Sequence, residues 1–111
     1  MSITKEWNGS TLCIMSGNDS YTYRYEPWQI TSTKTQAYKT DGWQTVTIPL
    51  SEFRIKDATL GDGRGAQAQT LTGLLGASGN SPLLLYLHNY GSAPTKTGFH
   101  GAFDNFRVVK R

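Results

Sequence analysis

Aromatic side chains at alternate positions are the feature of this sequence best suited to ligand contact. Tyr21, Tyr23 and Tyr25 are spaced two apart, and residues two apart in a β-strand share a face. Pro27 cannot donate a hydrogen bond to a sheet ladder and marks an edge or an end of that strand. We therefore expect Trp28 to be displayed near the rim of a sheet, where flat rings can stack on a flat, weakly apolar ligand face.

The run of residues 43–50 is the clearest strand signal in the chain. Val46, Ile48 and Leu50 alternate with polar residues, which is typical of a strand with one face toward a core and one toward water. A short turn follows, and we expect it to plug Phe53 into the end of the core.

Similar short runs, separated by Gly, Asn, Asp, Ser and Pro, recur along the chain, and helical periodicity is nearly absent. Residues 11–16 form the first run, residues 83–87 predict a central strand that is apolar on both faces, residues 101–109 predict a closing strand, and residues 70–75 allow one helical turn. The pattern predicts an all-β antiparallel sandwich, with a single domain over residues 1–111. The expected core residues are Leu12, Ile14, Val46, Ile48, Leu85 and Phe106.

The composition argues against several classes of partner. Only 17% of the residues are charged, and the net charge of +3 comes from 11 basic and 8 acidic residues without a Lys or Arg run. This scatter is not the basic stripe of a nucleic-acid-binding protein. Cys13 is the single cysteine, which excludes an internal disulfide and a cysteine zinc site. The longest apolar run, residues 83–87, is too short to span a bilayer, so we expect no direct membrane insertion of this chain.

Motifs for catalysis, cofactors and metals are weak. Most acidic residues lie in turns beside Gly, Asn or Ser, where they satisfy local backbone groups. His88 and His100 lack a partnering motif, and the glycines of residues 61–65 open no helix that could cradle phosphate. Asp104 could help to hold calcium, but capping or pairing in the closing strand is the simpler role. We predict no catalytic residue, no metal site and no cofactor.

Three pieces of the sequence coincide in a family resemblance. They are the aromatic segment that ends in Pro27 and Trp28, the run of residues 41–53 (DGWQTVTIPLSEF), and the closing residues 103–108 (FDNFRV). Together they resemble the C-terminal glycan-binding domain of outer-membrane surface glycan-binding proteins from Bacteroidetes, a group that includes xyloglucan-binding cell-surface proteins. The resemblance covers roughly residues 7–110.

The resemblance implies a carbohydrate-binding β-sandwich of the jelly-roll, galactose-binding-like type, without catalysis. Family domains are longer at the N-terminal side by about one or two strands of a typical jelly roll. We therefore expect an N-terminally truncated sandwich that is the C-terminal part of a longer protein. A truncated sandwich would leave an open sheet edge and allow self-association.

For a sugar ligand, rings stack on weakly apolar sugar faces while polar side chains take the hydroxyl groups. Trp28 is the leading stacking candidate, with rim packing as the alternative, and family members stack sugars on this segment. Tyr25 is a second candidate, whereas Tyr21 and Tyr23 are expected to pack across strands. Trp7 could form another wall of the platform or cap the open end of the core.

Polar candidates come from loops, where sites commonly form. Asn89 and Tyr90 follow a strand end, and Arg64 lies in the glycine-rich loop; we expect these residues to supply hydrogen bonds and further ring contact. Trp43 begins the run of residues 43–50, and in similar jelly rolls the matching tryptophan is mostly structural.

These observations favour a non-catalytic module that captures a polysaccharide or oligosaccharide. By resemblance we expect it at the cell surface or outer membrane, held by a lipid anchor outside this chain. Two alternatives stay open. The aromatic row could contact a neighbouring outer-membrane glycan-uptake protein, or the chain could be an accessory domain of a glycoside hydrolase.

Overall fold

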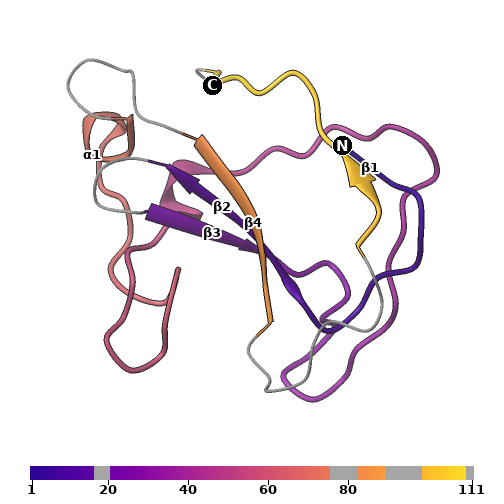
Figure 1. Cartoon of the computed structure of the whole chain (residues 1–111). Coiled ribbons are helices and arrows are strands. Elements are labelled where there is room, and N and C mark those ends of the chain that lie inside the picture. Colours follow the sequence, from indigo (N-terminus) through magenta and orange to yellow (C-terminus); the bar gives the residue numbers. More distant parts are fainter. Residues whose placement is uncertain (17–20, 76–82, 90–98, 110–111) are drawn as a thin grey trace. The chain divides into compact units, whose positions relative to one another are not determined.

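The computed structural model describes residues 1–16, 21–75, 83–89 and 99–109 (Figure 1). Two antiparallel sheets and almost no helix confirm the all-β prediction. No helix within these ranges is long and apolar enough to cross a membrane. In chain order the elements are β1 (Ser2–Ile3), β2 (Thr11–Ser16), β3 (Tyr21–Tyr25), the 3-10 helix η1 (Leu50–Glu52), α1 (Leu71–Leu75), β4 (Leu83–His88) and β5 (Gly101–Ala102).

The chain divides into two compact units. The first unit comprises Met1–Gly9, Pro27–Thr47 and Ala93–Arg111. The second unit comprises Ser10–Glu26 and Ile48–Ser92.

In the second unit, β2 pairs antiparallel with β3 on one side and with β4 on the other (Figure 1). Directly opposite residues of such strands share a face, so the register sorts the side chains into two sets. One face, which we call the tyrosine face, carries two rows of directly opposite residues across the three strands. One row is Tyr25, Leu12 and Leu87, and the other is Tyr23, Ile14 and Leu85. The opposite face, which we call the arginine face, carries the row Arg24, Cys13 and Tyr86 and the row Thr22, Met15 and Leu84.

The tyrosine face packs on the core of the second unit. Phe53, Ala68 and Leu74 form its buried cluster, and Tyr23 lies with its ring centroid 5.9 Å from that of Phe53. The prediction that Phe53 plugs the core is therefore confirmed. Leu12 is buried, as predicted, whereas the other expected core residues of this unit are only partly buried; these are Ile14, Ile48 and Leu85.

A hairpin of residues 53–68 continues the sheet beyond β3. Thr22 and Arg54 exchange backbone hydrogen bonds of 2.8 and 3.1 Å, and Arg54 in turn bridges Gln67. The hairpin closes where Asp57 and Gly61 exchange backbone bonds of 2.9 and 3.0 Å. This arrangement brings the glycine-rich loop of residues 61–65 beside β3.

The first unit is built from short pairings. β1 pairs with β5, and Trp7 and Tyr38 exchange two backbone hydrogen bonds of 3.0 Å. Ile3 donates its backbone N–H to the Thr40 hydroxyl at 2.8 Å, and Ile3 and Trp7 are fully buried. Residues 28–36 form a tight reversal of the chain, closed by a 2.8 Å bond from the Gln36 N–H to the Trp28 carbonyl.

The predicted strand over residues 43–50 is wrong. Its described backbone pairing is limited to Gln44, which exchanges hydrogen bonds of 2.8 Å with Met1. Trp43 is 62% exposed and Val46, an expected core residue, is 38% exposed. The run also crosses from the first unit to the second after Thr47. Alternation gives a segment one apolar face, but a strand forms only where a neighbouring segment takes its backbone groups.

Two other strand predictions need correction. Residues 83–87 do form a strand, but β4 lies at an edge of the three-stranded sheet, and Leu84 is 53% exposed. The central strand is β2. The closing strand is shorter than predicted, since within the described part of the chain it is limited to Gly101–Ala102, and Phe106 is 51% exposed instead of in the core. The helical turn is confirmed as α1.

Candidate functional site

Trp28 lies in the turn that follows β3, and the chain reversal of residues 28–36 fixes its backbone. Its ring is half-buried and meets Trp7 edge-on, with ring centroids 6.5 Å apart and planes at 78°. Trp7 is fully buried, and the Phe99 ring contacts it with ring centroids 5.1 Å apart and planes at 82°. An edge-to-face contact covers at most one face of the Trp28 ring. The buried position of Trp7 favours the packing alternative for this residue.

Tyr25 belongs to the second unit, and its half-buried ring continues the tyrosine face at 6.4 Å from Tyr23. The register places Tyr25 and Leu87 on either side of Leu12. The ends of β3 and β4 therefore flank the start of β2, and Asn89, directly after β4, lies at the same end of the sheet as Tyr25. Asn89 is half-buried. Tyr90 lies outside the described residues.

Arg64 is exposed in the loop of residues 61–65, and that loop is seated on the arginine face. Gly63 has a φ of +69°, and a Cβ atom there would lie 3.0 Å from the Thr22 carbonyl oxygen and from the Arg24 side chain. Only glycine fits such a close approach with a left-handed backbone. The sequence predicted an exposed loop here but not its attachment to the sheet.

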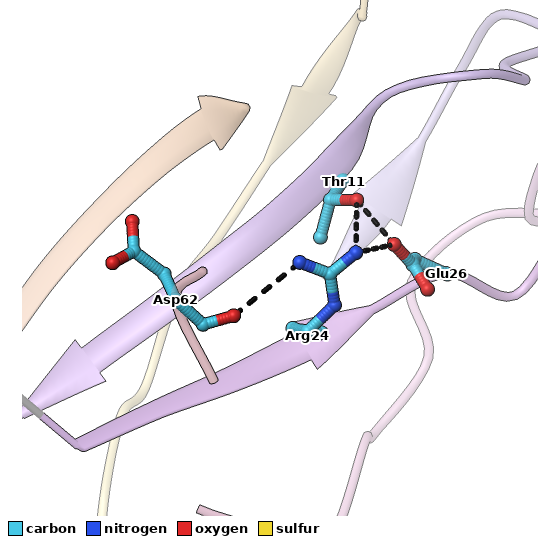
Figure 2. A network of polar contacts seen from close by, with 4 residues as sticks. All are labelled: Thr11, Arg24, Glu26 and Asp62. Atoms are coloured by element: carbon cyan, nitrogen blue, oxygen red, sulfur yellow. Dashed lines mark hydrogen bonds and ion pairs between the residues drawn. The ribbon is translucent and has the colours of Figure 1, made fainter. Parts of the chain in front are cut away.

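A polar network on the arginine face holds this arrangement. Figure 2 shows the Arg24 guanidinium between Asp62 on one side and Thr11 and Glu26 on the other. Arg24 Nη2 lies 2.6 Å from Glu26 Oε1 and 3.3 Å from Thr11 Oγ1, and the Thr11 hydroxyl also donates to Glu26. Arg24 Nη1 donates to the Asp62 carbonyl oxygen at 3.4 Å. The Arg24 and Glu26 side chains are only 10% and 15% exposed, so this network stabilises the unit and offers little surface to a ligand.

Tyr86 connects the network to β4. Its hydroxyl donates to Asp62 Oδ2 at 3.1 Å, while the Asp62 carboxylate points away from Arg24 (Figure 2). Burial, together with Cys13 and Asp62, raises the pKa of Tyr86 well above its ordinary value. Burial also raises the pKa of the Cys13 thiol. Both groups therefore stay protonated at neutral pH, and Cys13 is a buried thiol instead of a nucleophile.

The first unit also carries an open trough of about 610 Å³. Glu6 and Asn8 flank Trp7 in sequence, and Ala37 and Lys39 flank Tyr38, so alternation turns them to the side opposite the Trp7 ring. The trough is open to solvent, and charged side chains of Lys5, Glu6 and Lys39 are among those that line it. Within the described ranges, no group of three or more His, Cys, Asp or Glu side chains could hold a metal ion.

Sequence reasoning missed two features of these surfaces. Trp43, expected to be structural, is the most exposed of the three tryptophans. The Arg24 network was also missed, although one signal was present: Arg24 alternates with Tyr23 and Tyr25 and so must point to the opposite face from the rings.

A known protein family matches almost the whole chain. The family model described as surface glycan-binding protein B xyloglucan binding domain matches residues 1–110. No curated protein and no solved structure was found to match the chain. The family match confirms the resemblance carried by the three sequence pieces.

Proposed function

The chain belongs to the family of surface glycan-binding protein B xyloglucan-binding domains, and we propose that it captures polysaccharide, without catalysis, on the ring of Trp28. Xyloglucan is the first ligand to test, because the family description names it. Tyr25, Arg64, Asn89 and Tyr90 are the further contact candidates.

The edge-on support of Trp28 by Trp7 carries this proposal. A ring held by a buried neighbour and by a fixed backbone turn has little freedom to lose when a sugar stacks on it. Trp43 is more exposed, but among the residues that the structure describes the strand pairing of its stretch is limited to Gln44, so its ring would have to be ordered by the ligand. We therefore favour Trp28 over Trp43 as the stacking ring.

The absence of catalysis is supported by how two acidic groups of the second unit, Glu26 and Asp62, are used. Glu26 accepts from Arg24 and Thr11, and Asp62 accepts from Tyr86. Groups held in such bonds stabilise structure and are poorly placed to exchange protons with a substrate. An open ring platform binds weakly, because it must immobilise a flexible chain and displace ordered water. We expect micromolar or weaker affinity.

Affinity electrophoresis in gels that contain xyloglucan, mannan or mixed-linkage glucan tests the proposal. A stacking contact is worth about 1–3 kcal/mol, by analogy with rings stacked on nucleobases. Trp28→Ala should therefore abolish retardation, while the matched control Trp43→Ala should migrate like the parent. Retardation of Trp28→Ala equal to that of the parent, or a parent retarded by no glycan, would refute the proposal.

A second candidate function is contact with another protein, and the exposed leucines of β4 favour it. Leu83, Leu84 and Leu87 are 47%, 53% and 42% exposed on a strand whose described pairing is with β2 alone. A flat apolar edge strand invites pairing with a second chain. The simplest such partner is a second copy of this chain. Light scattering should then show concentration-dependent association that Leu84→Lys suppresses, and a strict monomer at high concentration would argue against self-association through β4.

At the level of the cell, we propose that the module works at the bacterial surface, held there by a lipid anchor outside this chain. The family description as a surface glycan-binding protein supports this location. Neighbouring glycan-uptake proteins are the partners that such a position would provide.

A further inference from the structure

The loop of residues 61–65 is fixed at its first half by Asp62. The Asp62 carbonyl oxygen accepts from Arg24 Nη1 at 3.4 Å, and its carboxylate accepts from the Tyr86 hydroxyl at 3.1 Å. Arg24 belongs to β3 and Tyr86 to β4, so this one residue is tied to both outer strands of the sheet. Gly63, directly after it, lies against the Thr22 carbonyl.

The second half of the loop is fixed by different bonds. The Gly65 N–H donates to the Ile55 carbonyl at 2.7 Å, and Arg54 Nη1 donates to the Gly65 carbonyl at 3.0 Å. A Cβ atom at Gly65 would lie 2.8 Å from the Ile55 carbonyl oxygen. Arg64 therefore lies between two anchored residues, and its own side chain is exposed.

We propose that Asp62 is a positioning residue, which latches the loop to the sheet so that the exposed Arg64 guanidinium is presented to pairs of neighbouring hydroxyl groups on a neutral polysaccharide. This inference rests on the proposed function. The planar guanidinium fork can donate two hydrogen bonds at once to a pair of oxygens. A fixed backbone lowers the cost of ordering that fork on binding. The Asp62 carboxylate is bound to Tyr86 and points away from Arg24, so its role is exerted through the loop and not on the ligand.

We call the bonds of Asp62 to Arg24 and Tyr86 the latch. It is tested first without ligand, by trypsin cleavage after Arg64. A protease needs a loop that opens locally. Asp62→Ala and Tyr86→Phe should both speed cleavage at Arg64, as followed by mass spectrometry, while cleavage after Lys39 in the first unit stays at the parent rate. Asp62→Asn keeps a side-chain oxygen that can accept from Tyr86 and should restore slow cleavage. Unchanged cleavage at Arg64 in both Asp62→Ala and Tyr86→Phe would overturn the latch.

The presentation of Arg64 is tested by a double-mutant cycle on xyloglucan affinity. Arg64→Ala should weaken binding roughly 3- to 10-fold, the range of one or two net hydrogen bonds. Asp62→Ala should weaken the parent by a similar factor but add less than about 2-fold to Arg64→Ala. Equal effects of Asp62→Ala with and without Arg64 would overturn the inference.

The failures of the two proposals are distinguishable. A parent that binds no glycan refutes the proposed function and the ligand half of this inference, while the cleavage result still decides the latch. If Asp62→Ala does not fold, Tyr86→Phe enters the same cycle in its place, since it removes only the hydroxyl that holds the Asp62 carboxylate.

Discussion

The two faces of the sheet formed by β3, β2 and β4 share one backbone and carry opposite chemistry. On the tyrosine face, Tyr23 packs against Phe53 and the rings lose apolar surface to a small core. On the arginine face, Arg24 is held by an ion pair and directed hydrogen bonds. Apolar burial is non-directional and scales with area, whereas the polar network depends on every partner being present.

This difference explains why an alternating row of tyrosines is a poor guide to a binding surface. Tyr21 and Tyr23 pack against the core cluster. Trp28 differs because it lies beyond the strand, in a turn of the first unit. Position after the strand end, and not membership of the aromatic row, makes it the better candidate for ligand contact.

The largest expected effect is on the free energy of unfolding, and it compares Phe53, in the core against which the tyrosine face packs, with Val46, an apolar residue that the structure leaves exposed. Phe53→Ala should lower the free energy of unfolding by about 3–4 kcal/mol, through lost burial and a residual cavity. Val46→Ala, at a site that is 38% exposed, should cost less than about 1 kcal/mol. Urea unfolding followed by tryptophan fluorescence measures both. Equal losses would mean that residue 46 is in a core after all.

A smaller effect tests whether the arginine face depends on its partners. Arg24→Met leaves the Glu26 carboxylate, 15% exposed, without its cation, and should cost about 2 kcal/mol. The double variant Arg24→Met with Glu26→Gln removes both charges and should recover part of that loss, because a neutral pair needs no compensation. Urea unfolding of the single and double variants decides the matter. Strict additivity of Arg24→Met and Glu26→Gln would contradict a coupled network.

Local pattern predicted the parts of the fold that are local. Residues 11–16 and 21–25 form strands as their alternation and turns indicated, and Phe53 is in the core. The pattern could not tell that β4 is an edge strand, or that residues 43–50 find little pairing, because both depend on which distant segment lies alongside. Apolar composition reports a preference for burial and does not supply the neighbour.

The same limit applies to the candidate site. Trp28 was predicted from its position after Pro27, since proline ends a ladder wherever the strand lies, together with the family resemblance of this segment. The arginine-face network joins residues 11, 24, 26, 62 and 86, and its members converge only after β3, β2, β4 and the loop are assembled. No spacing in the sequence encodes that convergence. The glycine at position 63 was the nearest signal, because a close approach of backbone to sheet requires it.

The smallest effect concerns alkaline pH and again compares the two faces. Burial raises the pKa of Tyr86 on the arginine face, with Cys13 and Asp62 adding to it, and burial raises that of Tyr23 on the tyrosine face. The unfolded chain releases each phenol proton near pH 10, before the folded protein does. The stabilisation is therefore complete below about pH 10 and is lost as pH rises further, at no more than about 1.4 kcal/mol per pH unit for each group.

Replacing each phenol by Phe in turn should make the decline between about pH 9.5 and 11 shallower. Tyr86→Phe should have the larger effect on this slope, because burial, Cys13 and Asp62 raise the pKa of Tyr86 strongly, and its hydroxyl is hydrogen-bonded to both side chains, whereas that of Tyr23 is raised by burial and by the charges of Glu52 and Glu26. Tyr86→Phe should also be less stable at pH 7, because it loses the bond to Asp62. Thermal unfolding across this pH range gives the slopes, with Cys13→Ser correcting for the buried thiol, whose pKa burial also raises. A slope unchanged by Tyr86→Phe would show that the Tyr86 hydroxyl is solvated, and the polar network would then end at Asp62.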